Sequence, residues 1–171
     1  MRARTKLLMT ATAVALVAGA PLASANSEIP EHARQGGLIE NVLFEGKVLD
    51  VEGARTESGT PVVLFEAHRG FNQQFQLVPT PMGYQLRAKQ SGKCVQPVTP
   101  RYGAQLVIEE CGSAPENFWF PEWSEGNLKL RNRTFPMACV TAQDPATGRQ
   151  NVTIEYCRPA DKSQEWKVVP V

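Results

Sequence analysis

Histidine and cysteine are scarce in this sequence of 171 residues, which contains two His and four Cys. Neither His32 nor His68 lies near a close pair of Cys or His residues, so the spacing typical of a structural zinc site is missing. A nucleophile–base pair would need a His near a free Ser or Cys, and no such pair stands out. Gly-rich phosphate loops are also absent. We therefore expect no metal, no cofactor and no enzymatic activity.

An excess of one charge and a long apolar run are missing as well. The first 25 residues contain the cations Arg2, Arg4 and Lys6. The rest of the sequence has 15 Lys and Arg residues and 17 Asp and Glu residues, which gives a formal net charge of −2. Both signs are scattered, which gives no attraction to nucleic acid or to an anionic membrane. No segment after residue 25 approaches 18 consecutive apolar residues, so we expect no membrane span.

The first 25 residues have the features of a secretory signal peptide. Their cationic start is followed by an apolar stretch from Leu7 to Ala20 and by the small residues Ala23-Ser24-Ala25. We expect cleavage before Asn26 and a secreted, extracellular protein with a single domain. Residues 26–36 are polar and contain Pro30, so they are predicted to form a flexible N-terminal arm.

One layout is repeated three times after residue 36. Phe75, Trp119 and Trp166 occupy the same place near the end of each copy and lie 44 and 47 residues apart. A repeat of this length is typical of a repeat architecture. Three large rings at equivalent positions are predicted to share one core. The expected copies are about 37–80, 81–124 and 125–171.

Short apolar runs between turn residues predict strands, and alternation is clearest in Tyr84–Arg87 and Leu128–Arg131. No apolar stripe of helical period extends over three turns. The pattern predicts an all-β body of three repeats with four strands each, related by pseudo-threefold symmetry and closed so that no edge strand is left. The expected strands are 38–43, 47–51, 61–66, 73–78, 83–88, 92–96, 104–109, 117–122, 126–131, 137–141, 150–155 and 164–169.

The four Cys residues form two local pairs in the second and third copies. Cys94 and Cys111 are 17 residues apart, and Cys139 and Cys157 are 18 apart, whereas both equivalent places in the first copy are apolar. Joint loss of both thiols is what disulfides within a copy would require, and secreted chains commonly pair their Cys residues. We predict the disulfides Cys94–Cys111 and Cys139–Cys157.

Four motifs of the first copy carry a resemblance to a known family: Val48–Val51, Ser58–Val62, Leu64–Glu66 and Asn72–Phe75. Together they resemble one repeat of the ricin-type β-trefoil lectins, closest to the family 13 carbohydrate-binding modules. The resemblance covers about residues 36–171 and implies a β-trefoil fold. The Gln-x-Trp signature of that family is intact only as Gln164-Glu165-Trp166.

A sugar site needs a carboxylate, an amide and an exposed ring that converge. By the family pattern, Asp50 accepts hydrogen bonds from two adjacent hydroxyls, Phe65 stacks on the sugar ring and Asn72 binds the same hydroxyls. Gln73 orients Asp50 or reaches the ligand, and His68 closes the rim. On a purely structural interpretation, Asp50 is a turn residue, Phe65 is core and the amides are loop residues.

The second and third copies depart from this pattern where it matters. Gln96 and Thr141 stand in the place of Asp50, Glu109 and Glu155 in that of Phe65, and Glu116 and Ser163 in that of Asn72. We expect these two copies to bind no sugar. In the third copy, Asp144 and Tyr156 lie close in sequence to the missing positions and are the residues that could still form a sugar site.

The expected function is that of a secreted, monomeric, lectin-like protein that binds galactose- or xylose-type sugars of a polysaccharide or glycoconjugate through its first repeat. A glycosidase would need two facing carboxylates, and Asp50 with Glu66 on one hairpin is a poor candidate. The alternative is a protein-binding trefoil, such as a protease inhibitor or a toxin-like recognition subunit, which would use the loops 99–102 and 144–147.

Overall fold

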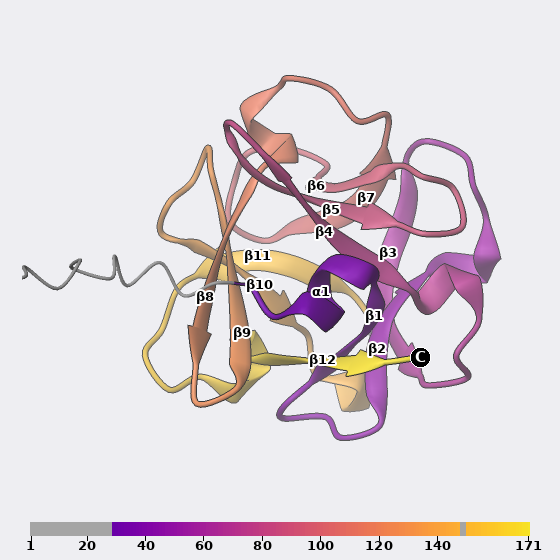
Figure 1. Ribbon diagram of the computed structural model, residues 1–171. Coiled ribbons are helices and arrows are strands. Elements are labelled where there is room, and N and C mark those ends of the chain that lie inside the picture. Colours follow the sequence, from indigo (N-terminus) through magenta and orange to yellow (C-terminus); the bar gives the residue numbers. More distant parts are fainter. Residues whose placement is uncertain (1–28, 148–149) are drawn as a thin grey trace, which may run out of the picture.

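The computed structural model describes residues 29–147 and 150–171, which form a closed all-β body with one short α-helix (Figure 1). Every strand overlaps one that the sequence predicts. The strands are β1 Gly37–Asn41, β2 Lys47–Val51, β3 Thr60–Glu66, β4 Phe75–Thr80, β5 Gly83–Ala88, β6 Cys94–Pro97, β7 Ala104–Glu109, β8 Trp119–Ser124, β9 Asn127–Asn132, β10 Ala138–Ala142, β11 Val152–Tyr156 and β12 Trp166–Pro170. The helical segments are α1 Glu31–Gln35 and the 3-10 turns η1 Glu52–Ala54, η2 Phe71–Gln73, η3 Pro115–Asn117, η4 Pro145–Thr147 and η5 Lys162–Gln164.

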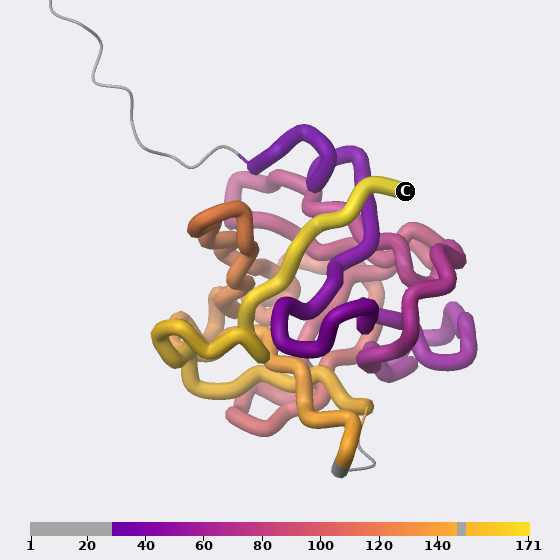
Figure 2. Tube along the Cα trace, turned by 90° about the horizontal axis from the view of Figure 1, so that it is seen from below, coloured from indigo at the N-terminus to yellow at the C-terminus, as the bar shows by residue number. Residues whose placement is uncertain are grey.

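Six strands close on one another as a barrel. β1 pairs with β4, β4 with β5, β5 with β8, β8 with β9, β9 with β12, and β12 with β1, all antiparallel. Figure 2 shows the result at the chain ends, where β12 runs beside the N-terminal segment that contains β1. The barrel therefore leaves no edge among these strands.

The other six strands form three hairpins, β2–β3, β6–β7 and β10–β11. The hairpins also contact one another, because β7 pairs with both β3 and β11, and Val63 of β3 forms a bridge with Asn151 just before β11. Each copy thus contributes one hairpin and two barrel strands, and residues distant in sequence meet where two hairpins join.

Alternation explains why these sequences form strands. In β9, Leu128 and Leu130 are fully buried, whereas Lys129 and Arg131 are partly exposed. Successive side chains of a strand point to opposite faces, so this pattern directs one face into the barrel.

The three aromatic rings at the end of each copy lie in the core. Phe75 is 1% exposed, and Trp119 and Trp166 are 0% exposed. The indole Nε1 of Trp119 donates to the carbonyl of Val95 at 3.0 Å, and that of Trp166 donates to the carbonyl of Val140 at 3.2 Å. Each Trp therefore links its barrel strand to the hairpin of its own copy.

The fourth strand of each copy begins two residues later than the sequence predicts. The 3-10 turns η2, η3 and η5 occupy the place of its first residues and end at Gln73, Asn117 and Gln164. In each turn the side-chain amide oxygen of this last residue accepts a hydrogen bond from a backbone N–H of the preceding loop. Such local bonds compete with the strand ladder, and apolar alternation does not reveal them.

The predicted disulfides are confirmed. Cys94 is bonded to Cys111 and Cys139 to Cys157, with a Cα–Cα distance of 5.0 Å in both. In the chain-entropy scheme a loop of this length contributes about 3 kcal/mol to stability. The first copy has the buried Val48, 1% exposed, in place of the first Cys.

Residues 29–36 differ from the expected flexible arm. They include α1, which packs against β4 and β12, and Ile29 and Ala33 are 3% and 2% exposed. These two apolar side chains, four residues apart, give the segment a face that the core covers. The rest of the predicted arm, 26–28, and the predicted signal peptide, 1–25, lie outside the described residues. No helix of the described part is long and apolar enough to cross a membrane.

Trp166→Ala is expected to lower the free energy of unfolding by about 3 to 5 kcal/mol, because it removes a fully buried ring and leaves a cavity. Phe120→Ala is the control, since Phe120 is 40% exposed and should matter far less. Urea denaturation of both variants tests this. A Trp166→Ala protein as stable as the wild type would mean that the ring is not part of the core.

Candidate functional site

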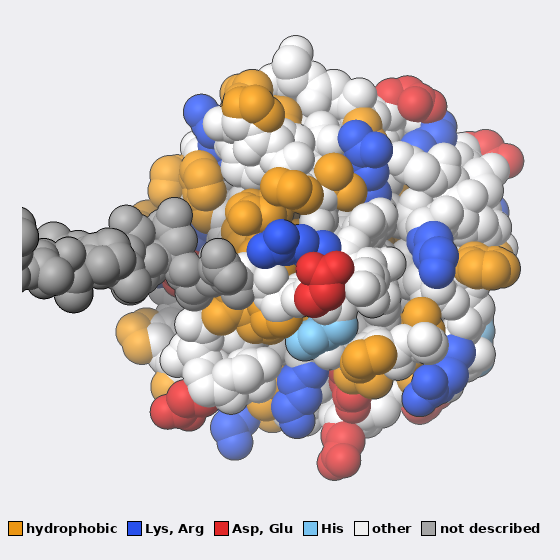
Figure 3. All heavy atoms as spheres, viewed as in Figure 1, with side chains coloured by type: hydrophobic (Ala, Val, Ile, Leu, Met, Phe, Trp, Pro, Cys, Tyr) orange, Lys and Arg blue, Asp and Glu red, His pale blue; other side chains and the backbone are white. Residues whose placement is uncertain are grey.

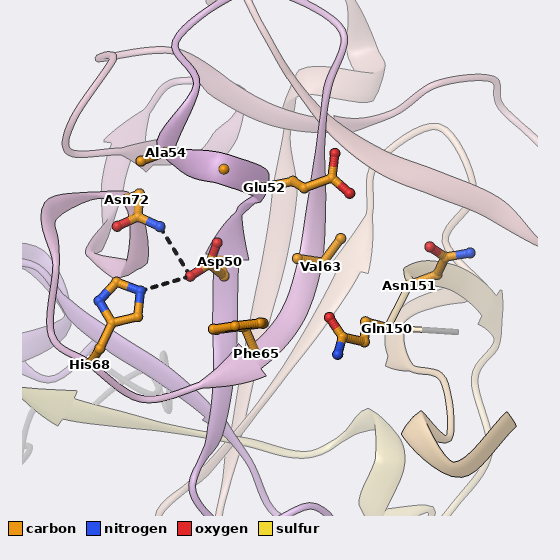
Figure 4. Close-up of a pocket in the computed structure, with 10 residues that line it drawn as sticks. Asp50, Glu52, Ala54, Val63, Phe65, His68, Asn72, Gln150 and Asn151 are labelled. Atoms are coloured by element: carbon orange, nitrogen blue, oxygen red, sulfur yellow. Dashed lines mark hydrogen bonds and ion pairs between the residues drawn. The ribbon is translucent and has the colours of Figure 1, made fainter. Parts of the chain in front are cut away.

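The first hairpin and the loop that follows it enclose a pocket of about 590 Å³ (Figure 4). Its walls come from β2, η1, β3, the loop between β3 and β4, and the segment before β11. The lining residues are Asp50, Glu52, Gly53, Ala54, Val63, Phe65, His68, Asn72, Gln150 and Asn151.

Asp50 is the buried carboxylate of this pocket. It lies on β2 opposite Val63 and is 4% exposed. Its Oδ2 accepts hydrogen bonds from Asn72 Nδ2 at 3.0 Å and Gln73 Nε2 at 2.8 Å, and lies 3.3 Å from His68 Nε2. No described residue donates to Oδ1. Side chains of the described residues therefore hold one oxygen of the carboxylate, whereas the other has no donor among them.

Burial raises the pKa of the Asp50 carboxyl above its ordinary value of 3.8. The hydrogen bond from Gln73, the charge interaction with His68 and the bond from Asn72 act in the opposite direction and offset only part of the cost. The structural interpretation made Asp50 a turn residue, but Asp50 lies on a strand. A buried carboxyl with a raised pKa is typical of a functional site.

Gln73 is 0% exposed and does not line the pocket. Its Nε2 donates to Asp50 and also to the carbonyl of Glu66 at 2.8 Å. Its Oε1 accepts from the backbone N–H groups of His68 at 2.8 Å and Arg69 at 3.0 Å. Gln73 therefore faces Asp50 and the loop backbone, not a ligand.

His68 and Asn72 sit side by side over Gly70. A Cβ added to Gly70 would lie 2.7 Å from Asn72 Oδ1 and 2.8 Å from His68 Cε1, so a larger residue would displace both. The backbone N–H of Gly70 donates to His68 Nδ1 at 3.2 Å, which leaves Nε2 of the imidazole to donate toward Asp50. The loop thus fixes both side chains beside the carboxylate.

Phe65 is 42% exposed and lines the pocket. Its ring meets that of His68 edge to face, with centroids 6.3 Å apart and an interplanar angle of 74°. Figure 4 shows it next to Asp50 on the neighbouring strand. An exposed ring beside a carboxylate and an amide is the arrangement that a sugar requires, and the interpretation of Phe65 as core is wrong.

The structure brings together all five residues predicted for the site, four of them lining the pocket and Gln73 behind it. Sequence reasoning missed the other lining residues. Glu52, Gly53 and Ala54 lie two to four residues after Asp50 and could have been found from that position. Gln150 and Asn151 are far away in sequence and reach the pocket only because the first and third hairpins contact each other.

The two other copies keep the buried amide but lose the carboxylate. Asn117 Nδ2 donates to Gln96 Oε1 at 2.8 Å, and Gln164 Nε2 donates to Thr141 Oγ1 at 3.1 Å. Thr141 is 3% exposed and its hydroxyl donates to a backbone carbonyl in its own strand. In these two copies the residue in the place of Asp50 therefore serves as a neutral partner of the buried amide.

A second pocket, of about 550 Å³, lies over the third copy and includes Asp144 and Tyr156. Tyr156 is 55% exposed, and Glu155 in the place of Phe65 is partly buried. The pocket has a ring and carboxylates, but no carboxylate at the Thr141 position. Among the described residues, no group of three or more His, Cys, Asp and Glu side chains could hold a metal ion.

Comparisons with known proteins bear on the family and the fold. The sequence matches the family described as Ricin-type beta-trefoil lectin domain over residues 35–166. No curated protein matches it. The structure is similar to the designed threefold-symmetric protein ThreeFoil, with a TM-score of 0.71 and 25% identity, over 80% of this chain and 99% of that one.

Two natural proteins of known structure show the same fold. A ricin B-like lectin from Macrolepiota procera, solved in complex with lactose, matches with a TM-score of 0.67 and 20% identity, over 81% of this chain and 97% of the lectin. An exo-beta-1,3-galactanase from Clostridium thermocellum matches with a TM-score of 0.70 and 19% identity, over 80% of this chain and 30% of the enzyme. The chain therefore spans less than a third of the galactanase.

Asp50→Asn should leave the protein at least as stable as the wild type at pH 7. Because the pKa of Asp50 is raised above 3.8 in the folded state, the wild type loses stability as the pH rises from 3.8 through that pKa. Asn cannot ionise, so its advantage should shrink as the pH falls to 3.8. Urea denaturation across this pH range measures the difference. A loss beyond about 1 kcal/mol at pH 7 would mean that the fold depends on the carboxylate.

Proposed function

The chain belongs to the ricin-type β-trefoil lectin family, and we propose that it is a secreted carbohydrate-binding protein that recognises a galactose- or xylose-type sugar mainly through its first repeat. The observation that carries this proposal is the buried Asp50 carboxylate, whose Oδ2 is held by the protein while Oδ1 accepts no hydrogen bond from the described residues.

In the proposed complex, Asp50 Oδ1 accepts hydrogen bonds from sugar hydroxyls. Asn72 Nδ2 is engaged by Asp50, which fixes the orientation of the amide and leaves its Oδ1 as a further acceptor. Phe65 stacks on the apolar face of the sugar ring, and His68 closes the rim. Gln73 positions Asp50 from behind.

The proposed repeats are 37–80, 81–124 and 125–171, related by pseudo-threefold symmetry. The equivalent hydrogen bonds of Gln73, Asn117 and Gln164 support this division. Because Asp50 has no carboxylate counterpart in the other repeats, we assign the sugar site to the first. Lactose is bound by the Macrolepiota procera lectin, and the galactanase acts on a galactose polymer, as their names state, so a galactose-type ligand is the first to test.

We propose no catalytic role for this chain. Glu66 is bound by Lys47 at 2.6 Å and its side chain is 68% exposed, and Glu52 in the pocket is paired with Arg55. Neither gives Asp50 the second, environmentally tuned carboxylate that glycoside hydrolysis requires.

Residues 1–25 are proposed to direct secretion, and the mature protein is proposed to act as a monomer on polysaccharide or glycoconjugate. Cationic and anionic side chains are interspersed on the face in view in Figure 3, so this face offers little attraction to nucleic acid or an anionic membrane. No segment is proposed to span a membrane.

Asp50→Ala should abolish sugar binding, because the lost charge-assisted hydrogen bonds are worth about 1.5 to 3 kcal/mol each to the complex. It should also lower the free energy of unfolding by about 1 to 3 kcal/mol, because the buried Gln73 amide loses an acceptor. Phe65→Ala should weaken binding of the same sugar through lost stacking. Gln96→Ala and Thr141→Ala are the matched controls in the other repeats and should bind as the wild type does. Titration calorimetry with a sugar selected on a glycan array measures all four.

Retained binding in Asp50→Ala, together with loss in Gln96→Ala or Thr141→Ala, would place the site in another repeat. A wild-type protein that binds no glycan on the array would overturn the lectin assignment and favour the protein-binding trefoil, with contacts through the loops 99–102 and 144–147.

A further inference from the structure

A second polar wall faces Asp50 across the pocket and comes from the third repeat. Gln150 and Asn151 precede β11, yet they line the same pocket as Asp50. Figure 4 shows them on the side opposite Asp50, with Phe65 and Val63 between the two walls. A ligand that covers Phe65 and extends away from Asp50 would meet this wall.

The backbone of the second wall is held against the first repeat. The N–H of Leu64 donates to the carbonyl of Gln150 at 2.6 Å, and Val63 forms a bridge with Asn151. On the other side, the N–H of Gln143 donates to the carbonyl of Asn151 at 3.0 Å. The backbone of both residues is therefore fixed before a ligand arrives, which lowers the entropic cost of binding.

The side-chain amides of Gln150 and Asn151 form no hydrogen bond with any described residue. Gln150 is exposed and Asn151 is partly buried. Each amide carries an acceptor oxygen and two donor hydrogens, which suits sugar hydroxyls that both donate and accept.

The other repeats do not repeat this wall. The strand register makes Thr60 and Pro61 the counterparts at the second repeat, and Ala104 and Gln105 those at the third. Of these four, only Gln105 has an amide, and its Nε2 is engaged by the carbonyl of Val62 at 2.6 Å. Two unengaged amides thus lie side by side only where they face the repeat that has the carboxylate.

The pocket volume of about 590 Å³ lies within the range of about 300 to 1,000 Å³ that is typical of small-molecule sites, and its two polar walls belong to different repeats. We propose that it holds a disaccharide, with one unit at Asp50 on Phe65 and the second unit against Gln150 and Asn151. This inference rests on the proposed function and extends it: the third repeat sets the selectivity of the first for a linked sugar over a free one.

The test compares a monosaccharide with its disaccharide, galactose with lactose and xylose with xylobiose, by titration calorimetry. The wild type should bind the disaccharide of the preferred series more tightly. The double variant Gln150→Ala/Asn151→Ala should lose about tenfold in affinity for that disaccharide and keep its affinity for the monosaccharide, because it removes contacts to the second unit alone. Gln35→Ala, an exposed amide on α1 outside the pocket, is the matched control and should bind both as the wild type does.

Equal affinity of the wild type for both members of the preferred series would overturn the disaccharide site and leave the sugar site at Asp50 standing. The same holds for a double variant that loses both sugars equally or neither. If Asp50→Ala keeps its affinity for both sugars, the proposed function itself fails, so the two failures are distinguishable.

Discussion

The buried side-chain amide of Gln73 is the interaction on which the site depends. Its four hydrogen bonds join Asp50 on β2, the end of β3 and the backbone of the loop at His68 and Arg69. Each such bond contributes about 0.5 to 1.5 kcal/mol net, but an unpaired partner in the interior costs more. Asn117 and Gln164 make the equivalent links in the other repeats, so this buried amide is part of the scaffold.

What distinguishes the first repeat is the acceptor that meets this amide. Gln96 and Thr141 are neutral partners, whereas Asp50 is a buried carboxyl whose pKa burial raises. A neutral residue can satisfy the same amide, as Gln96 and Thr141 do in the other repeats. The proposed ligand accounts for the carboxylate, and the exposed ring of Phe65 beside it suits a ligand with an apolar face.

The strands and the disulfides could be predicted from the sequence, because the same pattern of apolar runs and turn residues occurs three times along the chain. Alternation and turn residues located every strand, and the joint absence of both Cys residues from the first repeat located the disulfides. Contacts between distant segments could not be predicted in the same way. The 3-10 turn at Gln73 depends on side-chain bonds, α1 is ordered by packing of Ile29 and Ala33, and the wall at Gln150 forms only when the hairpins of the first and third repeats meet.

We propose that Asp50 is a ligand-binding carboxylate that the fold keeps in place at a cost in stability. The direct test of this proposal is an NMR titration of the Asp50 carboxyl carbon, without sugar and at saturating sugar. We expect the pKa of Asp50 to lie above the ordinary 3.8 in the free protein and to be lower in the complex, because sugar hydroxyls donate to the ionised form. An Asp50 pKa that does not change when sugar saturates the protein would contradict it.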